Sequence, residues 1–405
     1  MNPANRYRMI TSGTRCNIAA AWIAAAVLLA SFADAAPRVP VSGDVVLERL
    51  PPAFLAAKKV QGAPSPLTSS SNLEGALATA RHYIEVGQTY SDPRAYGYAQ
   101  AALGKWWDAD PAPAPVLVMR ARILQFRHEF KSALANLEAA LKSDQFDPDA
   151  WLLLASIEQV QGNVAAARAA CLKLIPMADL LVGATCVAST TALSAHAAPG
   201  EKLLAETLQK ATTASASELT WAWTTLAEIR ARRGEIVDAE SAFKSAIALE
   251  PDDVYSRAAY ADLLLDQNRP REVRVLLGDT QQADALLLRA ALAAQRNGDP
   301  DAAALRDNLA DRFAEARERS DQTHLREQAR FTFEVMHDVP LAMDLAKRNF
   351  AIQREPADAR VLLEVAAAAD DAVAAKPALD WLRSTAIEAP HLQTLATKFS
   401  GSVRE

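Results

Sequence analysis

The alternation of small and large apolar residues in the segment 220–251 constrains the fold of this chain more than any other feature. Ala227 and Ala239 permit a close approach of two helices, and larger apolar residues beside them fill the space around that contact. Gly234 predicts the turn between the two helices, and Pro251 predicts the end of the second one. The complete pattern consists of Trp223, Leu226, Ala227, Gly234, Ala239, Phe243, Ala246 and Pro251. We therefore predict a pair of antiparallel helices in this segment.

Related patterns occur on both sides of this pair. Ala133 and Ala167, which are 34 residues apart, have equivalent places in two upstream copies, and less regular copies start near residues 254 and 284. The spacing resembles the tetratricopeptide repeat, a helix–turn–helix unit of about 34 residues. A single unit cannot bury its apolar face, so several units must stack on one another. The resemblance implies an all-α fold, an α-solenoid of antiparallel helix pairs that form a right-handed superhelix.

Helix-breaking residues divide the rest of the chain into further pairs. At about 34 residues per repeat, residues 72–390 hold about nine helix pairs. We predict a C-terminal tail over residues 391–405. No segment shows the alternation typical of a strand, and the abundant Ala, Leu, Arg and Glu favour helices. In the less regular copies we expect helix breaks at Ser91–Pro93, Pro199–Gly200, His337–Pro340 and Asp370–Asp371.

Residues 1–35 have the composition of a bacterial export signal. Three arginines precede an apolar run from Ile18 to Phe32 in which Ser31 is the one polar residue, and small residues at positions 33 and 35 fit a cleavage site. Because the run is shorter than the roughly 20 residues that span a bilayer, we predict cleavage and a periplasmic or secreted protein. The alternative is an uncleaved signal that anchors the protein in the inner membrane. Residues 36–71 are rich in Pro and Ser, which predicts an extended or disordered linker.

Two of the three cysteines remain after this cleavage. Cys171 falls on the second helix of one predicted pair, and Cys186 falls on the first helix of the next pair. Neighbouring antiparallel helices bring facing residues close enough for a disulfide, and an exported protein meets an oxidising compartment. We therefore predict a disulfide between Cys171 and Cys186. The alternative is that both are free cysteines buried as small apolar residues.

The sequence contains no recognisable catalytic constellation. Phosphate-binding glycine loops, a nucleophile elbow and the H-E-x-x-H metal motif are absent from it, and its six histidines are widely spread. A net charge of −6 without a run of Lys or Arg argues against a nucleic-acid partner. We expect no catalytic residues, no cofactor, no metal and no enzymatic activity.

The resemblance also implies where a partner binds. In this repeat family the first helices of successive units line a concave groove that holds a protein or peptide partner. Transferred to this sequence, the groove positions are mostly polar, carry charges of both signs and include two aromatic rings. The candidate groove residues are Arg122, Gln125, Phe126, Ser156, Gln159, Glu228, Arg232, Tyr255, Asp262, Asp266, Gln295 and Arg296. For each residue taken alone, a solvated helix surface is the alternative interpretation.

These features together predict an exported, non-catalytic scaffold that mediates protein–protein interactions in the bacterial cell envelope. Two alternatives remain open at this point. The first alternative is an accessory component of envelope assembly or of polysaccharide or protein export. The second is an enzyme with an unrecognised site. Only Phe126 and Tyr255 are candidates for the row of aromatic rings that polysaccharide binding would require. The repeat scaffold itself serves many unrelated partners, so it indicates a fold more strongly than a function.

Overall fold

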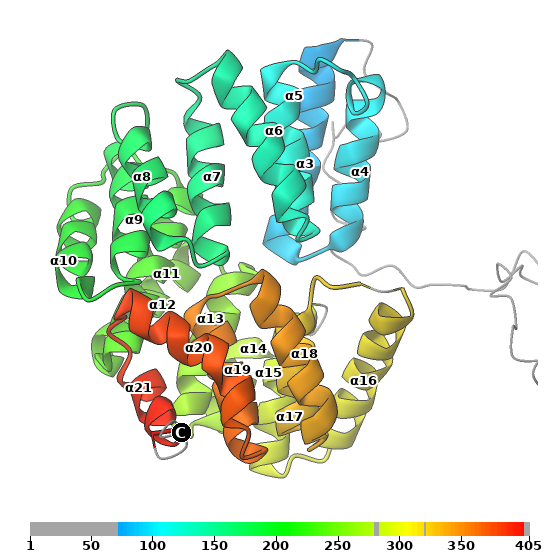
Figure 1. The fold of residues 1–405 in the computed structure, drawn as a ribbon, viewed down its shortest axis with the longest axis vertical. Helices are drawn as coiled ribbons and strands as arrows, with labels where there is room; N and C mark the ends of the chain where they lie inside the picture. The colour runs from blue at the N-terminus through cyan, green and yellow to red at the C-terminus, as the bar shows by residue number, and fades with distance from the viewer. Residues whose placement is uncertain (1–71, 279–282, 320, 401–405) are drawn as a thin grey trace, which may run out of the picture. The chain divides into compact units, whose positions relative to one another are not determined.

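The computed structural model of the chain describes residues 72–278, 283–319 and 321–400, all of which belong to the unit Ala53–Glu405. The predicted signal peptide (residues 1–35) and linker (residues 36–71) lie outside the described residues. Every regular element within the described ranges is a helix (Figure 1). The predicted all-α solenoid of helix pairs is therefore confirmed.

The described helices form nine consecutive pairs and one additional helix. A short 3₁₀ helix, η1 (Gly104–Trp106), follows the first pair. The pairs are α3 (Leu73–Tyr90) with α4 (Pro93–Leu103), α5 (Ala114–Phe126) with α6 (Phe130–Ser143), α7 (Pro148–Val160) with α8 (Val164–Leu174), α9 (Leu180–Thr191) with α10 (Ala197–Leu208), α11 (Ala216–Arg233) with α12 (Ile236–Leu249), α13 (Val254–Asp266) with α14 (Pro270–Leu277), α15 (Asp284–Asn297) with α16 (Ala302–Glu318), α17 (Leu325–Glu334) with α18 (Val339–Ile352), and α19 (Pro356–Ala368) with α20 (Ala372–Thr385). The additional helix is α21 (Pro390–Thr397).

The pair α11–α12 shows why this sequence pattern produces the repeat. Ala227 and Ala239 are completely buried at the place where the two helices pack. Phe243 is 1% exposed, and its ring stacks on that of Tyr260 from the next pair, with 5.6 Å between the centroids. Gly234 ends α11 in the left-handed region with φ +84°, a conformation that glycine adopts without the steric cost of a Cβ atom. In this pair the small residues allow the two helices to pack closely, and the large residue Phe243 packs the pair on its neighbour.

The predicted helix break at Pro199–Gly200 is wrong. α9 ends at Thr191 and α10 begins at Ala197, so both residues lie in the first turn of α10. Proline is tolerated there because its missing N–H has no intrahelical partner in any case. A Cβ atom on Gly200 would lie 3.2 Å from the backbone oxygen of Ala188, so this glycine allows α9 and α10 to pack closely.

The C-terminal segment also differs from the prediction. Residues 391–397, predicted as part of a tail, belong to α21 instead. Leu392 and Leu395 of this helix are buried in the same apolar cluster as residues of α18, α19 and α20. The reason is that α21 covers the apolar end that α19 and α20 would otherwise expose, as a terminal cap does in a repeat stack.

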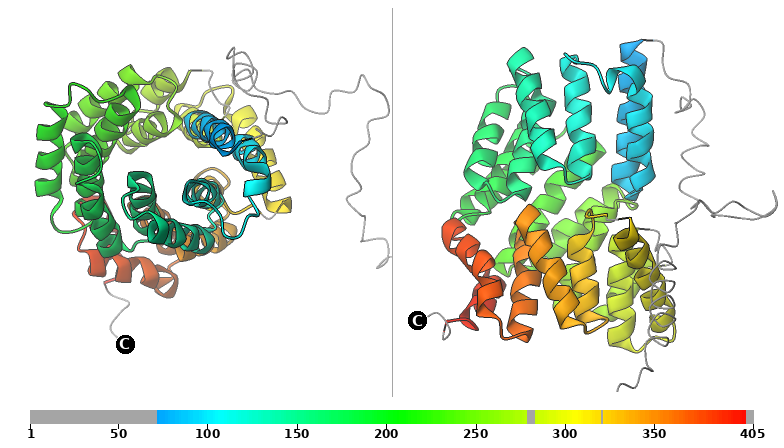
Figure 2. Two further views of the ribbon diagram at one scale, coloured as in Figure 1. Left: turned by 90° about the horizontal axis from the view of Figure 1, so that it is seen from above. Right: turned by 45° about the vertical axis from the view of Figure 1, so that its right-hand side comes forward.

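Within this unit the stack of helices coils until distant pairs touch (Figure 2). The backbone N–H of Arg354, which follows α18, donates to the oxygen of Val160 in α7 over 2.7 Å. The carboxylate of Glu388, before α21, accepts a 3.2 Å hydrogen bond from the N–H of Ala197 and lies 3.5 Å from Arg233. These contacts join the third to fifth pairs to the last ones, a closure that the sequence analysis did not predict.

The structure brings the two described cysteines together at the junction of two pairs. Cys171 on α8 and Cys186 on α9 are joined by an Sγ–Sγ bond of 2.03 Å, with 5.5 Å between their Cα atoms. Both residues are buried in one small apolar cluster with Ala155, Ala170 and Leu174. The structure thus has the predicted pairing, and the presence of this disulfide in the purified protein stays a prediction.

Candidate functional site

The first helices of the pairs face one another across the coil through polar side chains. Asp262 of α13 lies 2.6 Å from Arg330 of α17, and Asp266 of α13 lies 2.7 Å from Arg360 of α19. Helices two and three pairs apart therefore meet through these residues. We call the surface formed by these sides of the first helices, α5 to α19, the inner face. All the residues that the sequence analysis assigned to a groove lie on the first helices α5, α7, α11, α13 and α15.

Uncharged hydrogen bonds connect the first helices in the N-terminal half of the inner face. The amide of Gln125 on α5 donates to the hydroxyl of Ser156 on α7 over 3.1 Å. A glutamine–serine contact with the donor reversed occurs one unit later, where Ser189 on α9 donates to the amide oxygen of Gln159 over 3.1 Å. Predicted groove residues thus link α5 to α7 and α7 to α9.

The side chains around the end of α5 are partly used in packing. The ring of Phe126 stacks on that of Tyr96 with 3.6 Å between centroids and 8° between the planes. Burial raises the pKa of Tyr96 to about 12, so this phenol is neutral at physiological pH. Arg122 lies 3.3 Å from the exposed carboxylate of Asp149 at the start of α7. Phe126 also lines an open pocket of about 520 Å³ between the α5–α6 turn and the segment before α17.

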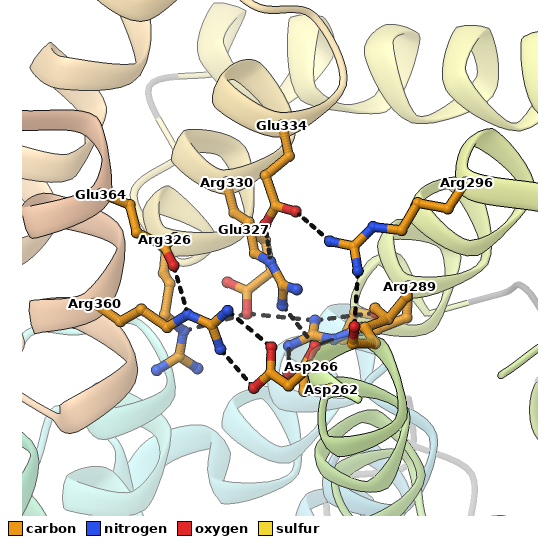
Figure 3. Close-up of polar contacts among 12 residues, drawn as sticks. Asp262, Asp266, Arg289, Arg296, Arg326, Glu327, Arg330, Glu334, Arg360 and Glu364 are labelled. Carbon is orange, nitrogen blue, oxygen red and sulfur yellow. Dashed lines mark hydrogen bonds and ion pairs between the residues drawn. The ribbon is translucent and has the colours of Figure 1, made fainter. Parts of the chain in front are cut away.

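Ion pairs replace these neutral contacts in the C-terminal half of the inner face (Figure 3). Asp262 accepts from Arg289 of α15 and from Arg330 of α17, both over 2.6 Å. Asp266 accepts two hydrogen bonds from Arg360 of α19, at 2.7 and 2.8 Å. The fork geometry of this second pair is the strongest form of an arginine–carboxylate contact.

Further members of this charged network were missed by the sequence analysis. They lie on α17 and α19, in copies that lack the consensus residues, and they are Arg326, Glu327, Arg330, Glu334, Arg360 and Glu364. The 34-residue spacing would have found two of them. Glu228, Asp262, Arg296, Arg330 and Glu364 follow one another at that interval. Because position in the repeat decides which way a side chain points, all five lie on the first helices at the same register.

The charges of the network shift acid pKa values in both directions. Burial opposes ionisation of Asp262, but the guanidinium groups of Arg289 and Arg330 outweigh it and hold the pKa of this carboxyl well below its usual range. At Glu355, which precedes α19, burial and the Asp358 carboxylate raise the pKa to about 7. Asp262 is therefore ionised at neutral pH, whereas Glu355 has a pKa near neutrality.

Tyr255, Glu228 and Arg232 form a second group at the edge of this network. The Tyr255 hydroxyl donates to Glu228 over 2.7 Å, although the Tyr255 residue as a whole is 60% exposed. The nearby Glu228 carboxylate raises the pKa of Tyr255 above its ordinary value. Burial also raises the pKa of Glu228, while Arg232, one turn further along α11, lowers it. An exposed ring thus stands beside groups of both charges.

The predicted groove residues therefore fall into distinct groups. Gln125, Ser156 and Gln159 take part in neutral bridges, and Glu228, Arg232 and Tyr255 lie together beside the charged network. Asp262, Asp266 and Arg296 belong to that network, where Arg296 donates to Glu334 over 3.0 Å. Gln295 is exposed on α15. Arg122 and Phe126 contact Asp149 and Tyr96, respectively, at the end of the coil nearest the N-terminus of the described chain.

Groups of His, Cys, Asp and Glu side chains suited to a metal ion are absent from the described ranges. None of the helices described here combines the length and the apolar composition that a membrane span needs.

Comparison with a family model places the repeat on a defined part of the chain. The model described as tetratricopeptide repeat matches residues 118–179, which extend from α5 to the residue before α9. This stretch consists of tetratricopeptide repeats, and the same architecture of helix pairs continues on both sides of it. A search of curated proteins finds no match.

Several solved structures are similar in fold to this chain. The crystal structure of the APC/C hetero-tetramer Cut9–Hcn1 has a TM-score of 0.46 and 13% identity, and the match covers 87% of this chain and 66% of that chain. For the human IFIT1 dimer with PPP-AAAA the TM-score is 0.43 at 13% identity, with 82% and 84% of the two chains covered. For yeast Tom70 the TM-score is 0.35 at 11% identity, with 81% and 88% covered. This chain therefore spans just under two thirds of the first of these structures.

Proposed function

We propose that this protein is a non-catalytic scaffold that binds a protein partner along the N-terminal half of its inner face. The architecture supports this proposal, because stacked tetratricopeptide repeats form extended surfaces suited to binding other proteins. The observation that carries it is the pair of neutral bridges between α5, α7 and α9. Each bridge uses only one end of a glutamine amide, Nε2 of Gln125 and Oε1 of Gln159. Within the described residues the opposite ends of both amides are left for a backbone hydrogen bond from a bound segment.

The contrast with the C-terminal half supports the same placement. There the groups on the inner face are already bonded to one another, so a partner must displace internal ion pairs before it can bind. In the N-terminal half a partner only adds hydrogen bonds to half-satisfied amides. Arg122, whose Asp149 partner is exposed, offers a cation at the same end of the surface.

Capture of a partner by the purified protein tests this proposal. The full chain is immobilised, incubated with extract of the source cells, and its bound proteins are identified by mass spectrometry. The double variant Q125A/Q159A should lose the partner. The matched control Q295A, which removes an amide from the C-terminal half, should retain it. Equal capture by both variants would place the binding site elsewhere, and the absence of any specific partner would contradict the scaffold proposal.

We further propose that the protein acts in the bacterial cell envelope after removal of residues 1–35. The apolar run and the small residues at its end support this proposal. Mass analysis of the protein recovered from the envelope fraction should show Ala36 as the first residue. A recovered chain that retains residues 1–35 would support the alternative of a retained membrane anchor instead.

A further inference from the structure

The salt bridges between α13 and the last two pairs are the longest-range polar contacts of the inner face. Asp262 and Arg330 are separated by 68 residues, and Asp266 and Arg360 by 94 residues. Most other contacts between first helices join neighbouring pairs, as between Asp262 and Arg289, which are 27 residues apart. The two long-range contacts therefore act across the coil and not along it.

Contacts of this kind control a property that neighbouring contacts leave free. In a helical-repeat stack each unit packs on its neighbours, and small changes in the angle between units add up along the stack. A small opening at each junction from α13 to α19 would therefore separate the sixth pair from the ninth. The Asp262–Arg330 and Asp266–Arg360 pairs resist that separation directly because they connect those ends.

The surroundings explain why these side chains reach one another. Asp262 has Arg289 beside it, which holds its carboxylate ionised and aimed toward α17. Glu364 holds the Nε of Arg360 at 2.8 Å, so the outer edge of the guanidinium is directed at Asp266. Arg330 is fixed in the same way by Glu334, one turn further along α17, over 2.6 Å. Both arginines are thus positioned by a carboxylate on their own helix before they contact α13.

We propose that Asp262 and Asp266, with Arg330 and Arg360, form a clasp that holds the C-terminal half of the inner face closed. With the clasp formed, the first helices α13, α17 and α19 are tied together and their charged groups are satisfied internally. With the clasp broken, the coil widens and exposes a strip that carries both acids and arginines. The C-terminal half is then a gated surface, unlike the N-terminal half, where the bridges join neighbouring helices only.

The Asp266–Arg360 pair of the clasp is suited to opening because neither side chain is deeply buried, whereas the Arg330 side chain of the other pair is only 11% exposed. The side chains of Arg360 and Asp266 are 27% and 38% exposed, so water and salt reach them. Ion pairs at this exposure are weak compared with the apolar packing between pairs, and added salt weakens them further. The apolar cores between neighbouring pairs do not have this sensitivity, so salt should act on the clasp first.

Distance measurements between spin labels on two outer helices test the proposal. Val275 on α14 and Val373 on α20 are 84% and 83% exposed, and they lie in the sixth and ninth pairs. Cysteines at these two positions are labelled in the C16S background with the Cys171–Cys186 disulfide kept oxidised. The variants D266N and R360Q should lengthen and broaden the distance distribution, and the charge-conserving variant D266E should change it less. The control D344N removes an exposed pair with Arg348 on α18 and should leave the distances unchanged.

Each outcome decides the matter. Unchanged distances in D266N and R360Q would overturn the proposal, as would an equally large increase in D266E. Circular dichroism identifies a variant that has lost its helices. If either variant unfolds, the original residues are kept and salt is raised to about 1 M, where the Debye length is about 3 Å. A widened distribution at high salt supports the clasp, and an unchanged one overturns it.

Discussion

Replacement of Phe243 by alanine tests the packing logic of the repeat most directly. Phe243 is 1% exposed, lies on the second helix of the fifth pair, and stacks on Tyr260 of the sixth pair. Removal of a buried phenylalanine costs about 3–5 kcal/mol, and the lost ring pair accounts for about 0.5–1.5 kcal/mol of that. This loss is a large part of the roughly 5–15 kcal/mol that holds an ordinary domain together.

The position of the lost ring predicts how the protein should unfold. The stability of a repeat stack is the sum of the stabilities of its units and of the interfaces between neighbours. F243A weakens the interface between the fifth and sixth pairs, so the transition should shift to lower urea concentration and separate into two steps. The change should be seen by circular dichroism, which follows all helices together. A calorimetric scan should show the same division.

The control for this experiment is V237A on the same helix. Val237 is 81% exposed, so its truncation should change the free energy of unfolding by no more than about 0.5 kcal/mol. A midpoint for F243A equal to that of V237A would refute the assignment of Phe243 to the interface. A shifted but single transition would show that the coil contacts keep the two halves cooperative in spite of the weakened junction.

Three further predictions concern titration, the disulfide and the closed coil. The pKa of Glu355 is raised to about 7 in the folded protein from an ordinary value of 4.5, so the contribution of this group to stability is highest below pH 4.5 and falls as the pH rises toward 7. E355Q should therefore stabilise the protein relative to the parent at pH 8 and much less at pH 4. Equal effects at both pH values in urea denaturation would exclude this titration. Cys171 and Cys186, 15 residues apart, should resist alkylation until reductant is added, and the double alanine variant should lose about 3 kcal/mol; intact mass showing two free thiols before reduction would contradict the pairing. Gly162 and Gly234 have similar φ values of +80° and +84°, but a Cβ atom on Gly162 would lie 2.8 Å from the Cβ atom of Arg354, whereas one on Gly234 would meet nothing within 4 Å. G162A should therefore destabilise the protein by more than the roughly 1 kcal/mol of backbone strain expected for G234A. Equal melting temperatures of the two variants would argue against the contact.

The sequence predicted the helix pairs well because their signals are local. A glycine or proline between two apolar helices acts within a few residues, as Gly234 does at the end of α11. The failure at Pro199–Gly200 has a different cause. There the packing of α9 on α10 requires a glycine inside the helix, and only the neighbouring helix reveals that requirement. A local pattern therefore identifies a helix break only where no tertiary contact uses the same residue.

The inner face was predicted in part for a related reason. The copies whose register could be assigned gave Glu228 and Asp262 by their place in the repeat, whereas α17 and α19 lack the alanine and glycine pattern that sets the register. Arg330 and Glu364 could have been reached by counting 34 residues onward from Arg296. The ionic partners themselves could not, because a contact between residues 94 apart depends on the curvature summed over three pairs.

The proposed location of the binding surface rests on the contrast between the two halves of the inner face. A groove residue is available to a partner only if the coil has not already satisfied it. Asp262 and Asp266 occupy groove positions, but arginines from α15, α17 and α19 hold both of them. Gln125 and Gln159 occupy groove positions in copies whose bridges use one end of each amide. In this proposal, position in the repeat determines which side chains point to the inner face. The curvature of the stack then determines which of those side chains keep hydrogen-bonding groups for a partner.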